Sequence, residues 1–261
     1  MNLILLHPSD FQTENTVLLC DHRARHIQKV LKPTLGQKLR VGRLNGSLGE
    51  AEVLEMHSDS VVLKCQFSAT PPPKPPIDLL LAMPRPKVLK RLWAQLAALG
   101  VGRIVLLNAS KVERYYFDTH ILQPEFYTAR LIEGLQQAGC THLPEVLIRP
   151  RFKPFVEDEL DTLFAEHTKI LADPHAEDSP LSFFQKEPKP KQLLLAIGSE
   201  GGWSSYEIDM LSVRGFKLIG LGTRILRTDT ACIALLCMLS EWLRDSSVSF
   251  STSLLENPLK K

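Results

Sequence analysis

The sequence predicts an α/β protein in which a small, mostly β unit precedes a larger unit built on a mainly parallel sheet. Two observations predict this division. Five prolines within residues 71–76 favour extended backbone and remove the donors that a helix or sheet would need. Short β-like runs precede them, and apolar runs alternate with amphipathic stretches after them. The 261 residues, 44% hydrophobic and 23% charged, can bury one large core or two unequal ones.

The first unit is expected to cover residues 1–70, with residues 71–76 as the linker. Its β-like runs are separated by Gly, Asn, Asp and Ser, which is typical of short strands joined by turns. The expected strands are residues 17–20, 38–44, 49–56 and 60–67.

The second unit is expected over residues 77–245. Its clearest helix begins at Pro86 and ends at Gly100, a proline and a glycine that suit the two ends of a helix. Short apolar strands joined by such helices predict a parallel sheet that is buried on both faces. The expected strands are residues 77–83, 103–108, 145–149, 168–173, 192–198 and 216–222, and the expected helices are residues 86–99, 124–138, 154–166, 205–214 and 229–244.

One loop of this unit is rich in glycine. Residues 195–209, LAIGSEGGWSSYEID, place three glycines between an apolar strand and a helix whose start is marked by Ser204 and Glu207, a capping-box pattern. Ligands of parallel sheets bind outside the carboxyl ends of the strands, where glycines let backbone groups approach them closely. The loop is therefore either a ligand-binding loop or only a tight turn.

A second loop of the same kind covers residues 222–229, and the two together predict one shared pocket. Arg224 and Arg227 lie near its mouth and would be costly if buried unpaired, so they should meet an acid, a phosphate or water. An internal salt bridge is the plainer alternative. The helix that follows is apolar on nearly every side over residues 231–239, so we expect it to be buried in the core or against a partner subunit.

The two loops make poor phosphate cradles. The first loop does not fit G-x-G-x-x-G, the chain has no G-x-x-x-x-G-K-[ST], and the carboxylate of Glu200 would repel phosphates. A cofactor that contains adenosine without a phosphate fits better.

The net charge of +2 hides an uneven distribution. Eight basic residues and two acidic ones lie between Lys74 and Arg114, a net charge of +6, and a shorter basic cluster lies within residues 21–32. Such clusters are typical of a partner with a phosphate backbone, although a solvated face is an equal alternative.

Other features exclude several classes of protein. The five cysteines are scattered, without a C-x-x-C pair, so we expect neither a disulfide framework nor a metal site. No apolar run is long enough to span a membrane, and the N-terminus lacks the pattern of a signal peptide. We therefore expect a cytoplasmic protein without a membrane partner. Residues 246–261 are polar and aperiodic, which predicts a loosely held, flexible tail.

Several motifs resemble a known family. IGSEGGWSSYEI and LGTRILRTDTACIALL resemble the paired C-terminal signatures of the RsmE family, RNA methyltransferases of the SPOUT superfamily, which usually read IGPEGG-[FL]-S-x-x-E and LGPRILRTETA. HIQKVLKPTLGQKLRVGRLNG and LAALGVGRI resemble two weaker segments upstream. The resemblance implies a PUA-like β-barrel for RNA, followed by a SPOUT domain whose chain forms a trefoil knot. It also implies S-adenosylmethionine as cofactor, a homodimer, and methyl transfer to N3 of a uridine in small-subunit ribosomal RNA or the assembled subunit.

The resemblance implies the cofactor-binding residues, while the chemistry of methyl transfer and the basic clusters suggest the catalytic and RNA-binding ones. Asp229 or Glu200 is expected as the general base, and Arg227 as the group that stabilises negative charge on the uracil oxygens. The expected cofactor-binding residues are Leu171, Asp173, Pro174, Ile197, Gly198, Glu200, Gly201, Gly202, Leu221, Gly222, Ile225, Leu226 and Thr228. The expected RNA-binding residues, which lie in or beside the basic clusters, are Arg23, Arg25, His26, Lys29, Arg85, Lys87 and Lys111.

The chain departs from the family pattern at several positions. Ser199 and Thr223 stand where the family usually has Pro, Asp229 stands where it has Glu, and Gln136 and Cys140 stand where Glu and Arg are common. The cofactor loops are thus mostly kept, while polar positions expected near the RNA are changed. Two alternatives stay open: a module that binds RNA or cofactor without transferring a methyl group, and a methyltransferase with another nucleic-acid target.

Overall fold

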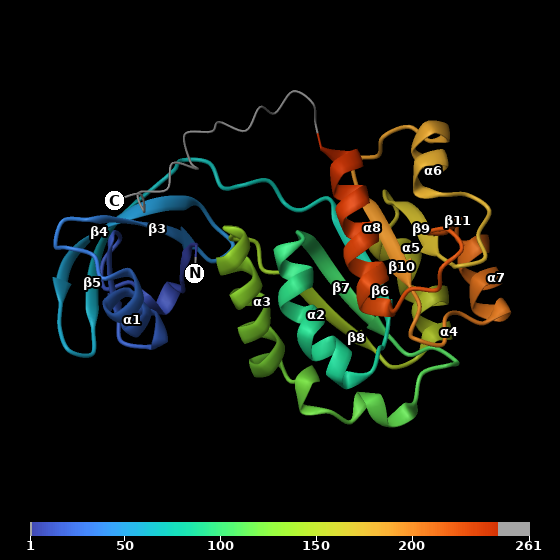
Figure 1. The fold of residues 1–261 in the computed structure, drawn as a ribbon, viewed down its shortest axis with the longest axis horizontal. Helices are drawn as coiled ribbons and strands as arrows, with labels where there is room; N and C mark the ends of the chain where they lie inside the picture. Colours follow the sequence, from blue (N-terminus) through green and yellow to red (C-terminus); the bar gives the residue numbers. More distant parts are fainter. Residues whose placement is uncertain (1, 245–261) are drawn as a thin grey trace.

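The computed structural model describes residues 2–244, and its strands form two separate sheets (Figure 1). The strands of the first sheet lie within residues 4–67 and those of the second within residues 77–219. Residues 68–76, which contain the five prolines, join the two sheets without forming a helix or strand. The tail expected at residues 246–261 lies outside the described residues.

The first sheet has the strand order β1-β3-β4-β5-β2. Its strands are β1 (Ile4–Leu6), β2 (Thr16–Leu19), β3 (Lys38–Arg43), β4 (Leu48–Met56) and β5 (Val61–Phe67). β1 pairs with β3 in parallel, and the remaining pairs are antiparallel. Sequence analysis missed β1, because three fully buried residues are too few to show the alternation that marks a strand.

A short helical segment covers one side of this sheet. α1 (His22–His26) continues as a π-helix over Ile27–Leu31 and ends at Lys32, whose φ of 47° is left-handed. Asp21 caps its start by accepting a hydrogen bond from the backbone N–H of Arg23 at 2.8 Å. The sequence had shown this stretch only as a basic cluster.

The second sheet has the order β11-β9-β10-β6-β7-β8, and all its pairs are parallel, which confirms the predicted sheet type. Its strands are β6 (Ile77–Ala82), β7 (Val101–Leu107), β8 (Glu145–Arg149), β9 (Thr168–Ala172), β10 (Leu193–Ile197) and β11 (Lys217–Ile219). Every residue of the central β10 is buried, as expected for a strand that is covered on both faces.

Helices cover both faces of this sheet (Figure 1). One face packs against α2 (Pro86–Ala98), α3 (Pro124–Ala138), α6 (Pro180–Lys186) and α8 (Thr228–Leu243). The other face packs against α7 (Ser205–Val213) and against α4 (Phe152–Pro154) and α5 (Leu160–Leu163), which a π-helix over Phe155–Glu159 joins. The helix expected at residues 154–166 therefore begins and ends earlier than predicted, and the short α6 was not predicted.

The first unit packs against the C-terminal end of α3. The backbone N–H groups of Asn2 and Leu3 both donate to the carbonyl of Gln136 at 3.1 Å, and the Thr141 hydroxyl donates to the carbonyl of Gly46 at 2.7 Å. Leu3 and Leu5 are part of the core of the second unit. These contacts attach the two units to each other on the α3 side.

Candidate active site

A cavity of about 260 Å³ lies at the carboxyl ends of β9, β10 and β11, where three loops and the first turns of α8 meet. This is the edge at which parallel sheets bind their ligands. The cavity is lined by Ala172, Asp173, Pro174, His175, Ile197, Gly198, Ser199, Glu200, Gly201, Gly202, Trp203, Ile219, Leu221, Arg224, Ile225, Leu226, Thr228, Ala231 and Leu235. The shared pocket predicted from the two strand-to-helix loops is therefore present.

Two of the expected cofactor-binding residues do not line this cavity. Leu171 is fully buried in the core on the opposite face, because successive side chains of a strand point to opposite faces; Ala172 lines the cavity instead. Gly222 lies in the exposed turn beside the cavity, with a φ of 86°. All the other expected cofactor-binding residues line it.

Arg224 lines the cavity, in agreement with its predicted place near the mouth. Seven further lining residues were not among those expected to bind the cofactor: Ala172, His175, Ser199, Trp203, Ile219, Ala231 and Leu235. Most of them flank predicted residues within the same loops, so adjacency in the sequence was the only signal for them. Ala231 and Leu235 lie on α8, and only the packing of that helix against the sheet brings them to the cavity.

The glycines of the first loop are required by a tight turn that also forms a wall of the cavity. A Cβ on Gly198 would lie 3.0 Å from the Cα of Gly202 and 3.2 Å from the backbone N of Trp203. Gly202 has a φ of 69°, in the region that favours glycine, and its N–H donates to the carbonyl of Ser199 at 2.8 Å. The two interpretations left open by the sequence, a tight turn and a binding loop, therefore both apply.

A buried carboxylate fixes this loop. Glu207 is 2% exposed and accepts hydrogen bonds from the backbone N–H groups of Ser204 at 2.8 Å and Ser110 at 2.7 Å. With the Ser204 hydroxyl facing the backbone N–H of Glu207, this confirms the predicted capping box. The ammonium group of Lys111 donates to the carbonyl of Trp203 at 3.1 Å. The loop after β7 and the glycine loop are thereby held together.

The arginines of the second loop are open to solvent. Arg224 and Arg227 are exposed, and within residues 2–244 neither forms an ion pair, so nothing there supports the alternative of an internal salt bridge. The hydroxyl of Thr228, which is buried, points to the carbonyl of Gly198 at 3.4 Å. This contact joins the two loops at the start of α8.

The three expected catalytic residues lie around this junction. The exposed Glu200 lines the cavity, and its carboxylate accepts a hydrogen bond from the backbone N–H of Arg85 at 3.1 Å. Arg227 and Asp229 do not line the cavity but flank Thr228, which does. The carboxylate of Asp229 pairs with the guanidinium of Arg91 at 3.0 Å. Of the two carboxylates expected as the base, Glu200 is therefore the one that lines the cavity.

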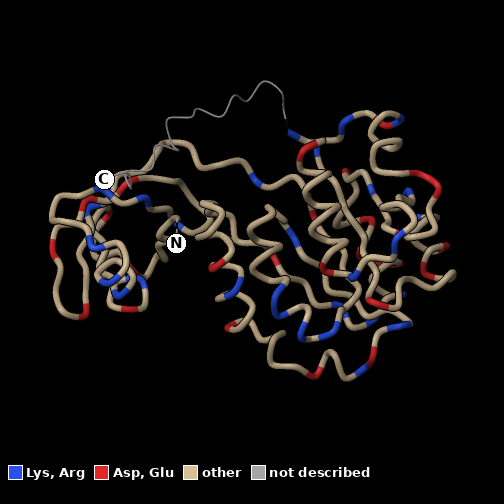
Figure 2. Tube along the Cα trace, in the orientation of Figure 1, with Lys and Arg blue, Asp and Glu red and all other residues tan. Residues whose placement is uncertain are grey.

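The expected RNA-binding residues form two groups, and Figure 2 shows basic residues both along the first unit and along α2. Arg25 and Lys29 are exposed on the helical segment of the first unit, where His26 is half-buried. The second group, near the carboxyl ends of β6 and β7, is exposed and consists of Arg85, Lys87 and Lys111.

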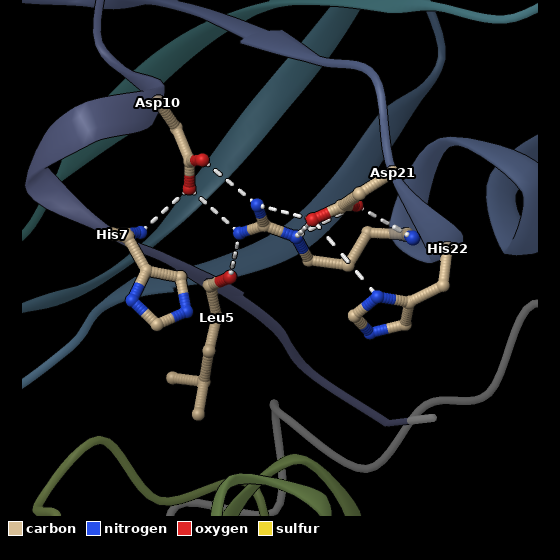
Figure 3. Close-up of polar contacts among 6 residues, drawn as sticks. Leu5, His7, Asp10, Asp21 and His22 are labelled. Atoms are coloured by element: carbon tan, nitrogen blue, oxygen red, sulfur yellow. Dashed lines mark hydrogen bonds and ion pairs between the residues drawn. The ribbon is translucent and has the colours of Figure 1, made fainter. Parts of the chain in front are cut away.

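Arg23 is an exception, because it is buried in an ion-pair network (Figure 3). A guanidinium group has five N–H donors. Here they donate to both carboxylate oxygens of Asp10 at 2.6 and 2.7 Å, to Asp21 at 2.8 to 3.1 Å and to the carbonyl of Leu5 at 2.7 Å. Burial acts to lower the pKa of Arg23, but the hydrogen bonds to the two aspartates outweigh it and raise that pKa. With every donor used, the expectation that Arg23 contacts RNA is not favoured.

The chemistry of the cavity fits a nucleoside-like ligand. Much of the wall is apolar, and it contains two buried polar atoms without a hydrogen-bond partner among the described residues, Ser199 Oγ and Trp203 Nε1. A pocket of this kind, mostly apolar with few polar groups, suits an aromatic ring that carries hydrogen-bonding substituents. In residues 2–244 no three His, Cys, Asp or Glu side chains lie together as metal ligands would, and no helix there combines the length and apolar character needed to cross a membrane.

Comparisons with known proteins agree with this site. The family model for the RNA methyltransferase domain matches residues 71–240. The ribosomal RNA small subunit methyltransferase E of Treponema pallidum is 30% identical over 244 residues, which cover 90% of this chain and 88% of that protein. Ribosomal RNA small subunit methyltransferase E 1 of Borreliella burgdorferi is 27% identical over 235 residues, covering 90% and 95%.

Solved structures share the fold. A ribosomal RNA small subunit methyltransferase E from Neisseria gonorrhoeae, crystallised with S-adenosyl methionine, superposes with a TM-score of 0.74 at 21% identity and covers 92% of this chain and 97% of that one. A putative methyltransferase from Legionella pneumophila, also in complex with this cofactor, gives a TM-score of 0.70 at 23% identity, covering 92% and 97%.

Fold and site together define an RNA methyltransferase domain with a ligand cavity at the carboxyl edge of its parallel sheet. Within that class, the chain belongs to the ribosomal RNA small subunit methyltransferase E family, RsmE, as its motifs had indicated.

Proposed function

We propose that this protein transfers the methyl group of S-adenosylmethionine to N3 of a uridine in small-subunit ribosomal RNA, in the cytoplasm. Family membership supports the reaction class. The observation that carries the proposal is the cavity of about 260 Å³ that the two strand-to-helix loops line. The Neisseria gonorrhoeae protein, which shares the fold, was crystallised with this cofactor.

The cavity suits this cofactor in shape and chemistry. Ile197, Leu221 and Leu226 offer an apolar wall to the adenine ring, and the carboxylate of Asp173 offers an acceptor to a hydroxyl or ammonium group. The volume of about 260 Å³ lies just below the roughly 300–1,000 Å³ typical of small-molecule sites.

The chain's own residues align the acceptor and remove its proton. Bound S-adenosylmethionine supplies a methyl group that is already activated by the positive charge of its sulfonium. Alignment of the reactants lowers the barrier by about 7–11 kcal/mol at best. Geometry favours Glu200 as the base for the uracil N3 proton, because Glu200 lines the cavity, whereas Asp229 lies outside it and is paired with Arg91. Arg227, exposed at the start of α8, is placed to stabilise negative charge on the uracil oxygens.

The exposed basic residues are assigned to the RNA backbone. Arg25 and Lys29 belong to the first unit, which we propose is a PUA-like barrel over residues 1–70, and Arg85 and Lys87 lie beside the cavity. Contacts with phosphates position the RNA and make binding dependent on salt. We do not assign such a contact to Arg23, whose donors are all used within the protein.

The proposal includes a homodimer with a trefoil knot in the second unit, residues 77–245. α8 supports the dimer, because Cys237 and Met238 on its outer side are exposed while its inner side fills the core. Exposed apolar surface of this kind often marks an interface. Sedimentation velocity is expected to give one species of twice the mass of the chain, and a monomer at micromolar concentration would remove this part of the proposal.

A labelling experiment tests the reaction. The purified protein is incubated with tritiated S-adenosylmethionine and either small ribosomal subunits or free RNA that lack the modification, and the labelled nucleoside is identified after digestion. Label in 3-methyluridine from the subunit is the expected result. Label in another nucleoside would mean a different target, and no label with the cofactor still bound would favour a binding module without transfer.

Variants of the site assign the roles. Arg227→Ala should abolish transfer and leave cofactor affinity largely intact. Arg151→Ala, at an exposed arginine that does not line the cavity, should leave both transfer and cofactor affinity unchanged. Glu200→Gln should lower the rate about 100-fold or more if Glu200 is the base. If Asp229→Asn gives the larger loss while Glu200→Gln is active, the assignment of the base passes to Asp229.

A further inference from the structure

A groove separates the first unit from α3, away from the cavity described above. It consists of two adjoining hollows of about 450 and 570 Å³, which share Glu133 and Gln136 as lining residues. α3 forms one wall, together with α2 at the hollow of about 450 Å³, and His7, His22 and His26 of the first unit line the other. In Figure 3 the rings of His7 and His22 both point toward the green ribbon below the ion-pair network.

Two side chains of this groove contain buried nitrogen atoms that lack a partner. Among the described residues, Nε2 of Gln136 and Nε2 of His26 form no hydrogen bond, and Gln136 is only 6% exposed. One belongs to each unit, and both line the same hollow of about 450 Å³. Buried polar atoms are normally paired, so these two point to a group that enters the hollow.

The charges in the groove disfavour a phosphate. The donors of Arg23 are all used by Asp10, Asp21 and the carbonyl of Leu5. Glu125 and Glu133 add two carboxylates to the lining. Burial lowers the pKa of His26, so its ring is uncharged at neutral pH and carries one donor and one acceptor. An uncharged group that both accepts and donates hydrogen bonds is therefore the favoured occupant.

We propose that this groove binds an unstacked base of single-stranded RNA, whose edge is read by the carboxamide of Gln136 and the ring of His26. Amide and imidazole groups hydrogen-bond to the edges of splayed-out bases in this way. Arg25 and Lys29, exposed beside His26 in the sequence, are placed to hold the neighbouring phosphates. This inference rests on the proposed RNA substrate. Because the groove shares no lining residue with the cofactor cavity, it takes a nucleotide other than the methylated one.

Fluorescence anisotropy with the full-length protein tests the proposal. The probes are short fluorescein-labelled homopolymers of A, C and U and a duplex of the same length. Gln136→Ala removes the carboxamide, Gln136→Glu keeps its size but loses the N–H donors, and His26→Ala removes the ring. Gln185→Ala, an exposed glutamine on α6, is the matched control.

Wild type and Gln185→Ala should prefer one homopolymer over the others and over the duplex. Both Gln136 variants and His26→Ala should bind that homopolymer about tenfold more weakly and lose the preference. The slope of log affinity against log salt should not change, because the phosphate contacts remain. Melting temperatures measured in parallel identify any variant that fails to fold.

Three results would overturn the inference. The first two are no base preference in the wild type, and Gln136 variants that bind like Gln185→Ala, in which case water alone fills the groove. Equal losses for duplex and single strands would mean that Gln136 only supports the contact between the two units, and would also overturn it. If the wild type transfers methyl groups but the Gln136 variants bind RNA normally, only this inference fails. If the variants lose the base preference but the wild type transfers no methyl group, only the proposed function fails.

Discussion

Replacing Arg23 by alanine tests whether this residue stabilises the first unit or contacts RNA. The side chain of Arg23 is 6% exposed and that of Asp10 is 11% exposed, so the substitution leaves a buried carboxylate without its partner. Removing one member of a buried ion pair costs about 3–5 kcal/mol. Because the side chain of Asp21 is 44% exposed and water can solvate it, we expect a loss near the lower end, about 3 kcal/mol.

Urea unfolding followed by circular dichroism measures this loss, and Arg25→Ala is the matched control on the same helix. Arg25 is exposed, so its removal should change the free energy of unfolding by less than about 0.5 kcal/mol but weaken RNA binding. Arg23→Ala should lower the free energy of unfolding by about 3 kcal/mol and leave RNA binding unchanged at temperatures where the variant is folded. If Arg23→Ala loses less than about 1 kcal/mol and weakens RNA binding as much as Arg25→Ala does, the argument from its five occupied donors is refuted.

Three further predictions follow from the packing and the pKa shifts. Burial acts to raise the pKa of Asp21, but the hydrogen bonds from Arg23 outweigh it and hold that pKa below its ordinary value. The Arg23–Asp21 pair therefore stabilises the fold above about pH 4, and this stabilisation is lost as the pH falls through the lowered pKa of Asp21. As the pH is lowered from about 5 to 2, the urea midpoint should fall more steeply for wild type than for Arg23→Ala. Parallel plots of midpoint against pH for the two proteins would contradict this. Gly134→Ala should destabilise by about 2 kcal/mol or more in thermal or urea unfolding, because its Cβ would lie 2.0 Å from the carbonyl oxygen of Ala94, a backbone atom of the packed α2. Burial raises the pKa of the Cys232 thiol to about 12, so iodoacetamide at pH 8 should modify it only in the unfolded chain, and mass spectrometry that finds it modified in the folded protein would argue against the packing of α8.

Local patterns accounted for most of the second unit. The apolar strands appear in the structure within a few residues of their predicted places, since a strand covered on both faces must be apolar throughout. The helix start at Ser204 and Glu207 was also predictable, because a capping box is a contact between residues three apart. Both features depend on neighbours in the sequence.

Contacts between distant segments account for what the sequence missed. The basic cluster around Arg23 suggested a surface, yet Asp10 and Leu5 lie more than ten residues away and occupy its donors only once the first sheet has folded. Leu171 was expected to bind the cofactor because it lies in the matching segment. Neighbouring side chains of β9 point to opposite faces, and only the packing of α8 on one face of the sheet decides that Ala172 is the one at the cavity.

The sequence by itself determined the class of the second sheet, the irregular proline-rich segment between the two sheets, and the two glycine-containing loops. These features depend on periodicity, on the conformations open to Gly and Pro, and on short-range caps. Tertiary structure alone decided which charged residues stay free to meet a partner. It buried Arg23, left Arg25 exposed, and brought Gln136 to face His26 across a groove. The physical reason is that burial and pairing of a charge depend on groups supplied by remote parts of the chain, which no local pattern encodes.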